Sequence, residues 1–193
     1  FIKNGYPFIF HAAEGIDEET FLEIDKLDAM GVLNENTVIV HGIALSVAQI
    51  NKLSNKNVSL IWCPSSNSFL FHRTAPISEI KNKIRIGLGT DSTLTGLPTL
   101  WEEMRFACES GLATPHEIFE MVSSTAADIF KLRNYSHRIN NSIAADLLVL
   151  PINRNDIWEN LIFSTSSDIK LFLIDGFPQL VDCDHCRMLD LSP

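Results

Sequence analysis

The chain has 193 residues, of which 46% are hydrophobic, and its formal net charge is −9. This length suits one globular domain, or a domain and a half, with a sizeable core. The acidic balance argues against a protein that binds the phosphate backbone of nucleic acids, because such proteins usually carry a basic surface. No apolar run reaches the roughly 18 residues that a membrane-spanning helix needs, so we expect neither a nucleic acid nor a membrane as partner.

The first two thirds of the chain alternate between predicted strands and predicted helices. Short apolar or β-branched runs predict strands at residues 6–10, 37–40, 58–62 and 84–88. Their continuous hydrophobicity is typical of parallel strands that are covered on both faces. Amphipathic or capped segments predict helices at residues 17–30, 46–55, 75–83 and 97–111. One strand followed by one helix, repeated, predicts an α/β fold with right-handed crossovers and a parallel sheet.

The pattern changes at Thr114. Residues 114–132 predict two helices, 145–151 a short strand, 155–163 a short helix, and 168–182 a hairpin that turns at Asp175-Gly176. These late strands are too few for a stable sheet, so we expect them to complete a sheet with strands from elsewhere. The change divides the chain into predicted domains at residues 1–133 and 134–193.

Polar side chains that can bind a ligand follow each of the four early strands. They are His11 and Glu14 after the first, His41 after the second, the segment "CPSSN" (63–67) after the third, and Asp91 and Ser92 after the fourth. The carboxyl ends of parallel strands meet at one edge of a sheet, which is where α/β enzymes place their sites. Imidazole nitrogens and carboxylate oxygens converging there predict a metal centre.

Each of these residues also has an ordinary structural interpretation. His11 and His41 are alternatively strand-end histidines, Glu14 a solvated residue before a helix, and Asp91 the cap of a turn in "GTDS". Their shared position at equivalent strand ends favours the site. His72, in "LFHRT" shortly after the third strand, is a further candidate for contact with substrate.

The four cysteines are too sparse for a disulfide framework, which favours a reducing compartment and a cytoplasmic protein. Two of them form "CDHC" (183–186), which is similar to half of a zinc knuckle. A structural zinc needs four ligands, and no second pair exists at suitable spacing. We therefore expect ordinary cysteines near the end of the chain.

Six motifs in order resemble the amidohydrolase superfamily, in particular its branch of cytosine deaminases, S-adenosylhomocysteine/methylthioadenosine deaminases and triazine chlorohydrolases. They are "HAAEG" (11–15), "VHG" (40–42), "WCPSSN" (62–67), "GLGTDS" (87–92), "EEMRFA" (102–107) and "IAADLLVLP" (143–151). The resemblance implies a (β/α)₈ barrel with a small β-sandwich. The four strands of this chain then correspond to barrel strands five to eight, the C-terminal half.

The resemblance also implies roles for the strand-end residues. His11 is expected to bind a divalent metal, zinc with iron as the alternative, and Asp91 to bind it and to accept a proton from water. Glu14 is expected to carry a proton to the substrate ring, and His41 to orient the attacking hydroxide or to stabilise the tetrahedral intermediate. Asn67 and Ser92 are expected near the substrate, as is His72 from its position after the third strand. The implied reaction is hydrolysis of a C–N bond, other than a peptide bond, in a heterocyclic small molecule, above all deamination, with hydrolysis of a C–Cl bond as the alternative.

One departure from the family pattern is decisive. The family carries a His-x-His pair after barrel strand one, and none of the six histidines of this chain forms such a pair. We therefore expect the chain to be the C-terminal half of a longer enzyme, associated with the N-terminal half or with a second copy. The alternative is an inactive partial barrel that serves only in assembly.

Overall fold

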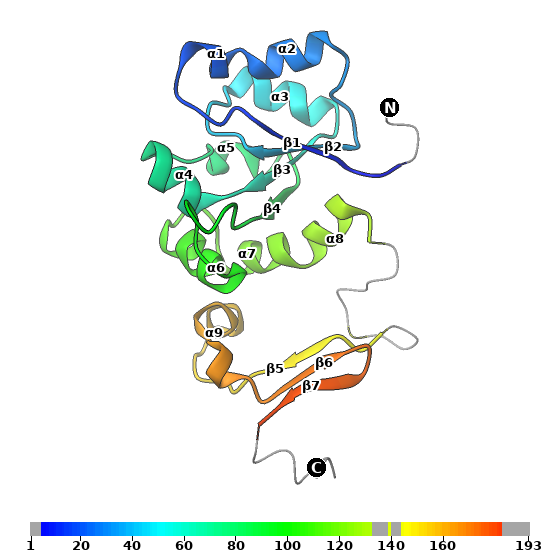
Figure 1. Ribbon diagram of the computed structural model, residues 1–193, viewed down its shortest axis with the longest axis vertical. Helices are drawn as coiled ribbons and strands as arrows, with labels where there is room; N and C mark the ends of the chain where they lie inside the picture. The colour runs from blue at the N-terminus through cyan, green and yellow to red at the C-terminus, as the bar shows by residue number, and fades with distance from the viewer. Residues whose placement is uncertain (1–4, 133–138, 140–143, 183–193) are drawn as a thin grey trace. The chain divides into compact units, whose positions relative to one another are not determined.

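The computed structural model describes residues 5–132, 139 and 144–182. The chain divides into two compact units, residues 1–132 and residues 133–193. The first unit holds a four-stranded sheet and the second a three-stranded sheet (Figure 1). Whether these units are the predicted barrel and sandwich portions stays a prediction.

The first unit is built on a parallel sheet in the order β1-β2-β3-β4. Its strands are β1 (Phe8–Ala12), β2 (Thr37–His41), β3 (Ser59–Trp62) and β4 (Ile86–Leu88). The prediction of an α/β fold with a parallel sheet is confirmed. Every residue of β2, β3 and β4 is buried, which explains why their sequences are continuously apolar or β-branched instead of alternating.

Two strands end later than their hydrophobic runs predict. β1 continues through His11 to Ala12, and β2 continues to His41, because the parallel pairing of Ala12 with His41 extends the backbone ladder past the apolar residues. His11 and His41 are therefore part of the strands, whereas the prediction placed them just after the strand ends.

Helices connect the strands and cover the sheet. They are α1 (Glu18–Phe21), α2 (Glu23–Ala29), α3 (Val47–Asn55), α4 (Pro64–Phe71), α5 (Ile77–Ile80), α6 (Leu100–Glu109), α7 (Pro115–Val122) and α8 (Ser124–Phe130). One cluster of the core joins Val38 and Val40 of β2, Ile61 of β3 and Cys63 to Ile129 of α8. This packing of helix on sheet buries the apolar face of α8 and fixes the sheet beneath it.

The single helix predicted over residues 17–30 is wrong, because the structure has two short helices there. The N–H of Leu22 donates to the carbonyl of Glu19 at 3.1 Å, a tight turn that ends α1. Ile24 in α2 is buried, whereas Met30, at the C-terminal end of α2, is 72% exposed.

The second unit contains β5 (Leu147–Val149), α9 (Ile157–Phe163), a 3₁₀ turn (Ser166–Asp168), β6 (Leu171–Ile174) and β7 (Phe177–Val181). Its strands form an antiparallel sheet in the order β5-β6-β7. The hairpin turns at Asp175 and Gly176, whose φ angles of 51° and 77° are those of the tight turns that fit the twist of paired strands. The predicted hairpin is confirmed.

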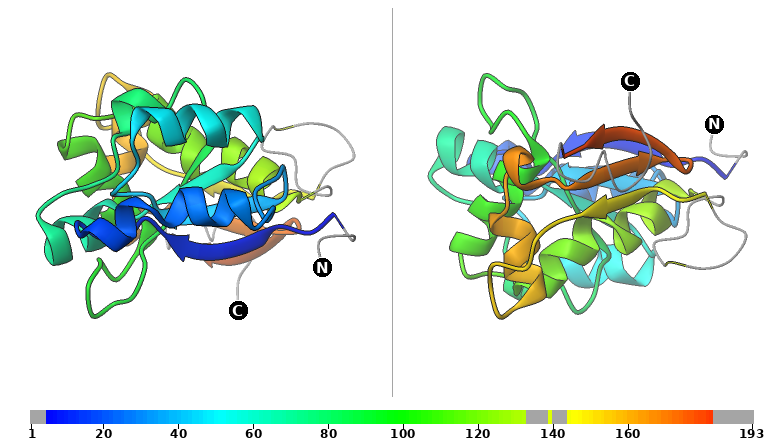
Figure 2. Two further views of the ribbon diagram at one scale, coloured as in Figure 1. Left: turned by 90° about the horizontal axis from the view of Figure 1, so that it is seen from above. Right: turned by 90° about the horizontal axis from the view of Figure 1, so that it is seen from below.

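The outer edge of β1 is open. β1 is the dark-blue strand in the left view of Figure 2, and among the strands that the structure describes it pairs with β2 alone. Phe8 and Ile9 on this strand are each 47% exposed. Among residues 5–132, 139 and 144–182, no helix combines the length and the hydrophobicity that crossing a bilayer requires.

Candidate active site

The carboxyl ends of β1 to β4 bring the predicted residues to one edge of the sheet. The register pairs His11 with Val40 and Ala12 with His41. Between β3 and β4, the N–H of Gly89 donates to the carbonyl of Trp62 and continues the pairing of these strands toward Asp91. Parallel pairing thus fixes these strand ends side by side.

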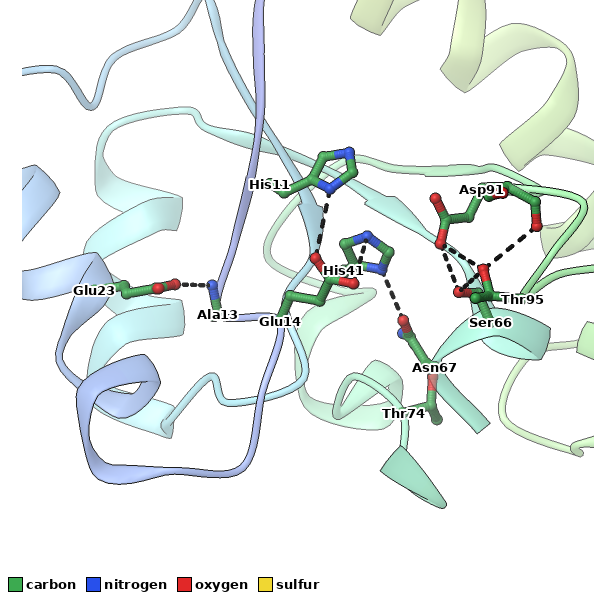
Figure 3. Close-up of polar contacts among 11 residues, drawn as sticks. His11, Ala13, Glu14, Glu23, His41, Ser66, Asn67, Thr74, Asp91 and Thr95 are labelled. Atoms are coloured by element: carbon green, nitrogen blue, oxygen red, sulfur yellow. Dashed lines mark hydrogen bonds and ion pairs between the residues drawn. The ribbon is translucent and has the colours of Figure 1, made fainter. Parts of the chain in front are cut away.

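His11, Glu14 and His41 form one tight group. Each offers a ligand atom, and these atoms all lie within 4.8 Å of one another. The Glu14 carboxylate lies between the two imidazoles: Oε2 is 3.4 Å from Nδ1 of His11, and Oε1 is 3.4 Å from Nε2 of His41 (Figure 3). The imidazole rings meet edge to face with their centroids 4.8 Å apart. Asp91 is not a member of this group.

A left-handed turn at Ala13 brings Glu14 back over the end of the strand. The φ angle of Ala13 is 53°, and its N–H donates to Oε2 of Glu23 in α2 at 2.6 Å. This bond from a neighbouring helix stabilises a backbone conformation that a non-glycine residue rarely adopts. Glu23 therefore helps to position Glu14.

His41 is fully buried and held by a side chain from α4. Its Nδ1 lies 2.8 Å from Oδ1 of Asn67, whose Nδ2 donates to Oγ1 of Thr74 at 3.3 Å. Because Oδ1 is an acceptor, this network assigns the proton of the neutral imidazole to Nδ1. The lone pair on Nε2 then faces the Glu14 carboxylate.

One buried nitrogen of the site, Nε2 of His41, lacks a hydrogen-bond donor in the described part of the chain that would satisfy its lone pair. Nε2 of His41 is buried without a hydrogen-bond partner among the residues that the structure describes, and its contact with Glu14 does not have hydrogen-bond geometry. Two acceptor atoms that face each other repel unless a proton or a cation lies between them. A proton donor or a cation between the two atoms would satisfy both of them.

Asp91 follows β4 in a left-handed conformation, with φ of 57°. Its Oδ2 accepts from Oγ of Ser66 at 2.5 Å and from Oγ1 of Thr95 at 3.2 Å. Burial alone raises the pKa of Asp91, but the Ser66 hydroxyl, the nearby His41 and the N–H of Ser92 outweigh it, and the pKa lies below its ordinary value. The carboxylate is therefore charged at neutral pH, as a metal ligand must be.

The three residues predicted to touch substrate occupy different surroundings. Asn67 is buried and bonded to His41, whereas Ser92 is exposed and its Oγ accepts from the N–H of Leu94 at 3.2 Å. His72 ends α4 with φ of 49° and lines a cavity of about 390 Å³ with Trp62. None of His11, Glu14, His41 and Asp91 lines that cavity. The substrate contacts of these three residues stay predictions.

Three residues that position the site were not singled out from the sequence. Ser66 holds Asp91, Glu23 holds the turn before Glu14, and Glu103 lies buried against the start of α4. Ser66 and Glu103 fall within the quoted motifs "WCPSSN" and "EEMRFA", so the motif itself was the available signal. Glu23 lies in no such motif. The "CDHC" segment lies outside the described residues.

The thiol of Cys63 is expected to be inert in the folded protein. Burial, followed by the charges of Asp91, Glu103 and Glu14, raises its pKa to about 12. At pH 8 its thiolate fraction is then on the order of 10⁻⁴, and the thiolate is the reactive form. Peptide mapping after brief iodoacetamide treatment should show the partly exposed Cys108 labelled and Cys63 unlabelled. Equal labelling of both would contradict this burial.

Comparison with known proteins agrees with the motifs. Residues 4–176 match the Amidohydrolase family. The chain is 27% identical over 206 residues to a 5-methylthioadenosine/S-adenosylhomocysteine deaminase of Dictyoglomus turgidum, covering 89% of this chain and 47% of that protein. A protein of the same description from Pyrococcus abyssi is 25% identical, with 90% and 46% covered. The chain thus spans about half the length of these relatives.

Solved structures show the same fold. An adenosine deaminase from Xanthomonas campestris with bound zinc matches with a TM-score of 0.76 at 20% identity, covering 96% of this chain and 49% of that one. The zinc complex of atrazine chlorohydrolase TrzN from Arthrobacter aurescens matches with a TM-score of 0.72 at 17% identity, covering 97% and 48%. Because the family match extends over most of the sequence, the chain belongs to the amidohydrolase family.

Proposed function

We propose that this chain is the C-terminal half, strands five to eight, of a metal-dependent amidohydrolase barrel that deaminates a heterocyclic small molecule. The observation that carries the proposal is the group of His11, Glu14 and His41, whose ligand atoms lie within 4.8 Å of one another at the carboxyl edge of a parallel sheet. The similarity to methylthioadenosine/S-adenosylhomocysteine deaminases supports a purine nucleoside as the substrate class.

The donor set fits one divalent metal. Imidazole nitrogen and carboxylate oxygen are ligands that zinc accepts, with iron as the alternative. In this proposal His11 and Asp91 hold the metal, and the charged state of Asp91 agrees with that role. When bound, such a metal lowers the pKa of a water molecule and thereby supplies a nucleophile at neutral pH.

In this proposal, side chains of this chain transfer the protons of the reaction. Deamination forms a C–O bond with water and breaks a C–N bond, so protons must move from water to the ring nitrogen and to the leaving ammonia. Glu14, exposed enough to reach substrate and next to both imidazoles, is the proton carrier. His41, oriented by Asn67, aligns the attacking oxygen through Nε2.

The remaining ligands come from elsewhere in this proposal. This sequence has no His-x-His pair, and the relatives are about twice as long as the matched region. The open edge of β1, with Phe8 and Ile9 half exposed, is the strand that the other half of a barrel would pair with. A second copy of the chain is the alternative partner, and we place the assembled enzyme in the cytoplasm.

A second candidate function is assembly without catalysis. It is favoured by the same absence of a His-x-His pair, since a metal held by His11 and Asp91 alone has half of its ligands. In that case the apolar edge of β1 is the functional surface.

Metal analysis and an ammonia-release assay decide between these functions. The assembled enzyme, this chain together with the other barrel half, should contain about one metal per active site and should deaminate 5′-methylthioadenosine or S-adenosylhomocysteine. The 193-residue chain alone should bind little metal and show no turnover. An assembled protein without metal and without ammonia release would support the assembly function. Stoichiometric, tight zinc in the chain alone would contradict the need for a second half.

A further inference from the structure

We infer that Glu103 is a positioning residue, which fixes the first turn of α4 from within α6. That turn carries the two side chains that hold the proposed catalytic groups. The catalytic importance of Glu103 rests on the proposed function. Its structural role is argued from the contacts described below.

Glu103 is fully buried, which is costly for a carboxyl group unless it is well bonded. Both of its oxygens accept from Ser65: Oε1 accepts from the backbone N–H at 2.9 Å, and Oε2 accepts from Oγ at 2.5 Å. Burial raises the pKa of Glu103 above its ordinary value, although the two bonds from Ser65 counteract part of that rise. Both carboxyl oxygens thus contact the same residue of α4.

The start of α4 needs such a partner. Its N-cap residue is Cys63, whose side chain makes no capping hydrogen bond, and Pro64 occupies the first helical position. The N–H groups in the first turn of a helix have no partner within the helix, and a carboxylate there is favourable. Glu103 therefore supplies from another helix the acceptor that an N-cap side chain usually provides.

The two residues after Ser65 face the site. Oγ of Ser66 donates to Oδ2 of Asp91, and Oδ1 of Asn67 lies 2.8 Å from Nδ1 of His41. Successive residues of a helix point in directions that differ by about 100°. A rotation of this turn would therefore move both contacts together.

Ser65 also forms a hydrogen bond with the loop that contains Asp91. Its Oγ accepts from the N–H of Leu97 at 3.3 Å, and that N–H also lies close enough to Glu103 to lower its pKa. Glu103 thus joins α6, the start of α4 and the loop after β4. Its removal should loosen Asp91 and His41 without removing any group that touches substrate.

The test compares Glu103→Ala and Glu103→Gln with Glu109→Gln in the assembled protein. Glu109 lies on the same helix and is exposed, so its replacement is the matched control for the loss of a carboxylate. The first readout is the ¹⁵N spectrum of the histidine side chains in metal-free protein, which reports the tautomer of His41. The second is kcat and KM for deamination, with circular dichroism as the check on folding.

In wild-type protein we expect His41 to carry its proton on Nδ1. Glu103→Ala should mix the two tautomers and lower kcat by about 10–100-fold with KM nearly unchanged. Glu103→Gln, which keeps one acceptor oxygen, should fall between Glu103→Ala and wild type, and Glu109→Gln should match wild type. If Glu103→Ala fails to fold, Glu103→Gln and Ser65→Ala provide the same comparison.

A folded Glu103→Ala protein with the wild-type His41 spectrum and wild-type kcat would overturn the inference. So would a loss of stability alone, with the His41 spectrum of the folded protein unchanged. The spectrum does not depend on turnover. An enzyme without deaminase activity whose His41 tautomer still responds to Glu103 would therefore reject the proposed function and support this inference.

Discussion

Replacement of Glu14 by glutamine is expected to lower kcat by about 10²–10⁴-fold. The amide has the shape of the carboxylate but cannot take up and release a proton at the ring nitrogen of the substrate. Its position between His11 and His41, 3.4 Å from a nitrogen of each, should be retained. KM and the metal content, measured by steady-state kinetics and elemental analysis, should therefore change little.

Glu19→Gln is the matched control for this change. Glu19 lies nearby on α1 and is exposed, so loss of its charge alters the local field without touching the site. Its kcat should equal that of wild type. If Glu14→Gln kept wild-type turnover, the proton carrier would be another group. If it instead lost the metal, Glu14 would be a ligand, and the assignment of roles within the group would have to change.

Much of the sheet and of the proposed site could be predicted from the sequence. Parallel strands buried on both faces leave a continuous apolar signature, and residues 37–40 and 58–62 carried it plainly. Once the strands are parallel, their carboxyl ends share an edge. The grouping of His11 with His41 follows from that rule, without any knowledge of side-chain contacts.

The layer of positioning residues could not be predicted in this way. Ser65 and Glu103 are 38 residues apart in the sequence, and their contact depends on how α6 packs against α4. Such packing is set by side-chain shape over the whole unit, not by local periodicity. The helix break at Leu22 was missed for a related reason, because the competing turn forms through one backbone hydrogen bond that composition does not reveal.

Backbone conformation was also invisible in the sequence. Ala13, His41 and Asp91 all have positive φ angles, of 53°, 78° and 57°, and all lie at the proposed site. None of the three is a glycine, so their residue types did not indicate a left-handed backbone conformation. A non-glycine residue keeps such a strained conformation only when the surrounding contacts hold it, and residues of this kind are common at functional sites.

The second large effect is expected for a substitution at Gly42, which follows His41 and is closely packed. This glycine has φ of +65°, and a Cβ added to it would lie 2.8 Å from Cδ1 of Leu60 and 2.9 Å from Cδ1 of Leu45. Both leucines are buried, at 1% and 6% exposure, so they have little room to move. Gly42→Ala should lower the free energy of unfolding by about 2–5 kcal/mol, the sum of left-handed strain and overpacking.

Gly111→Ala separates these two contributions. Gly111 has φ of +70°, but nothing lies within 4 Å of an added Cβ, so only the backbone strain of about 1–2 kcal/mol applies there. Urea unfolding of both variants should therefore show a larger loss for Gly42→Ala, and only that variant should disturb the adjoining His41 and reduce turnover in its folded fraction. Equal losses would mean that the two leucines relax freely, and rigid packing beneath the strand end could then not be what holds His41 against Glu14.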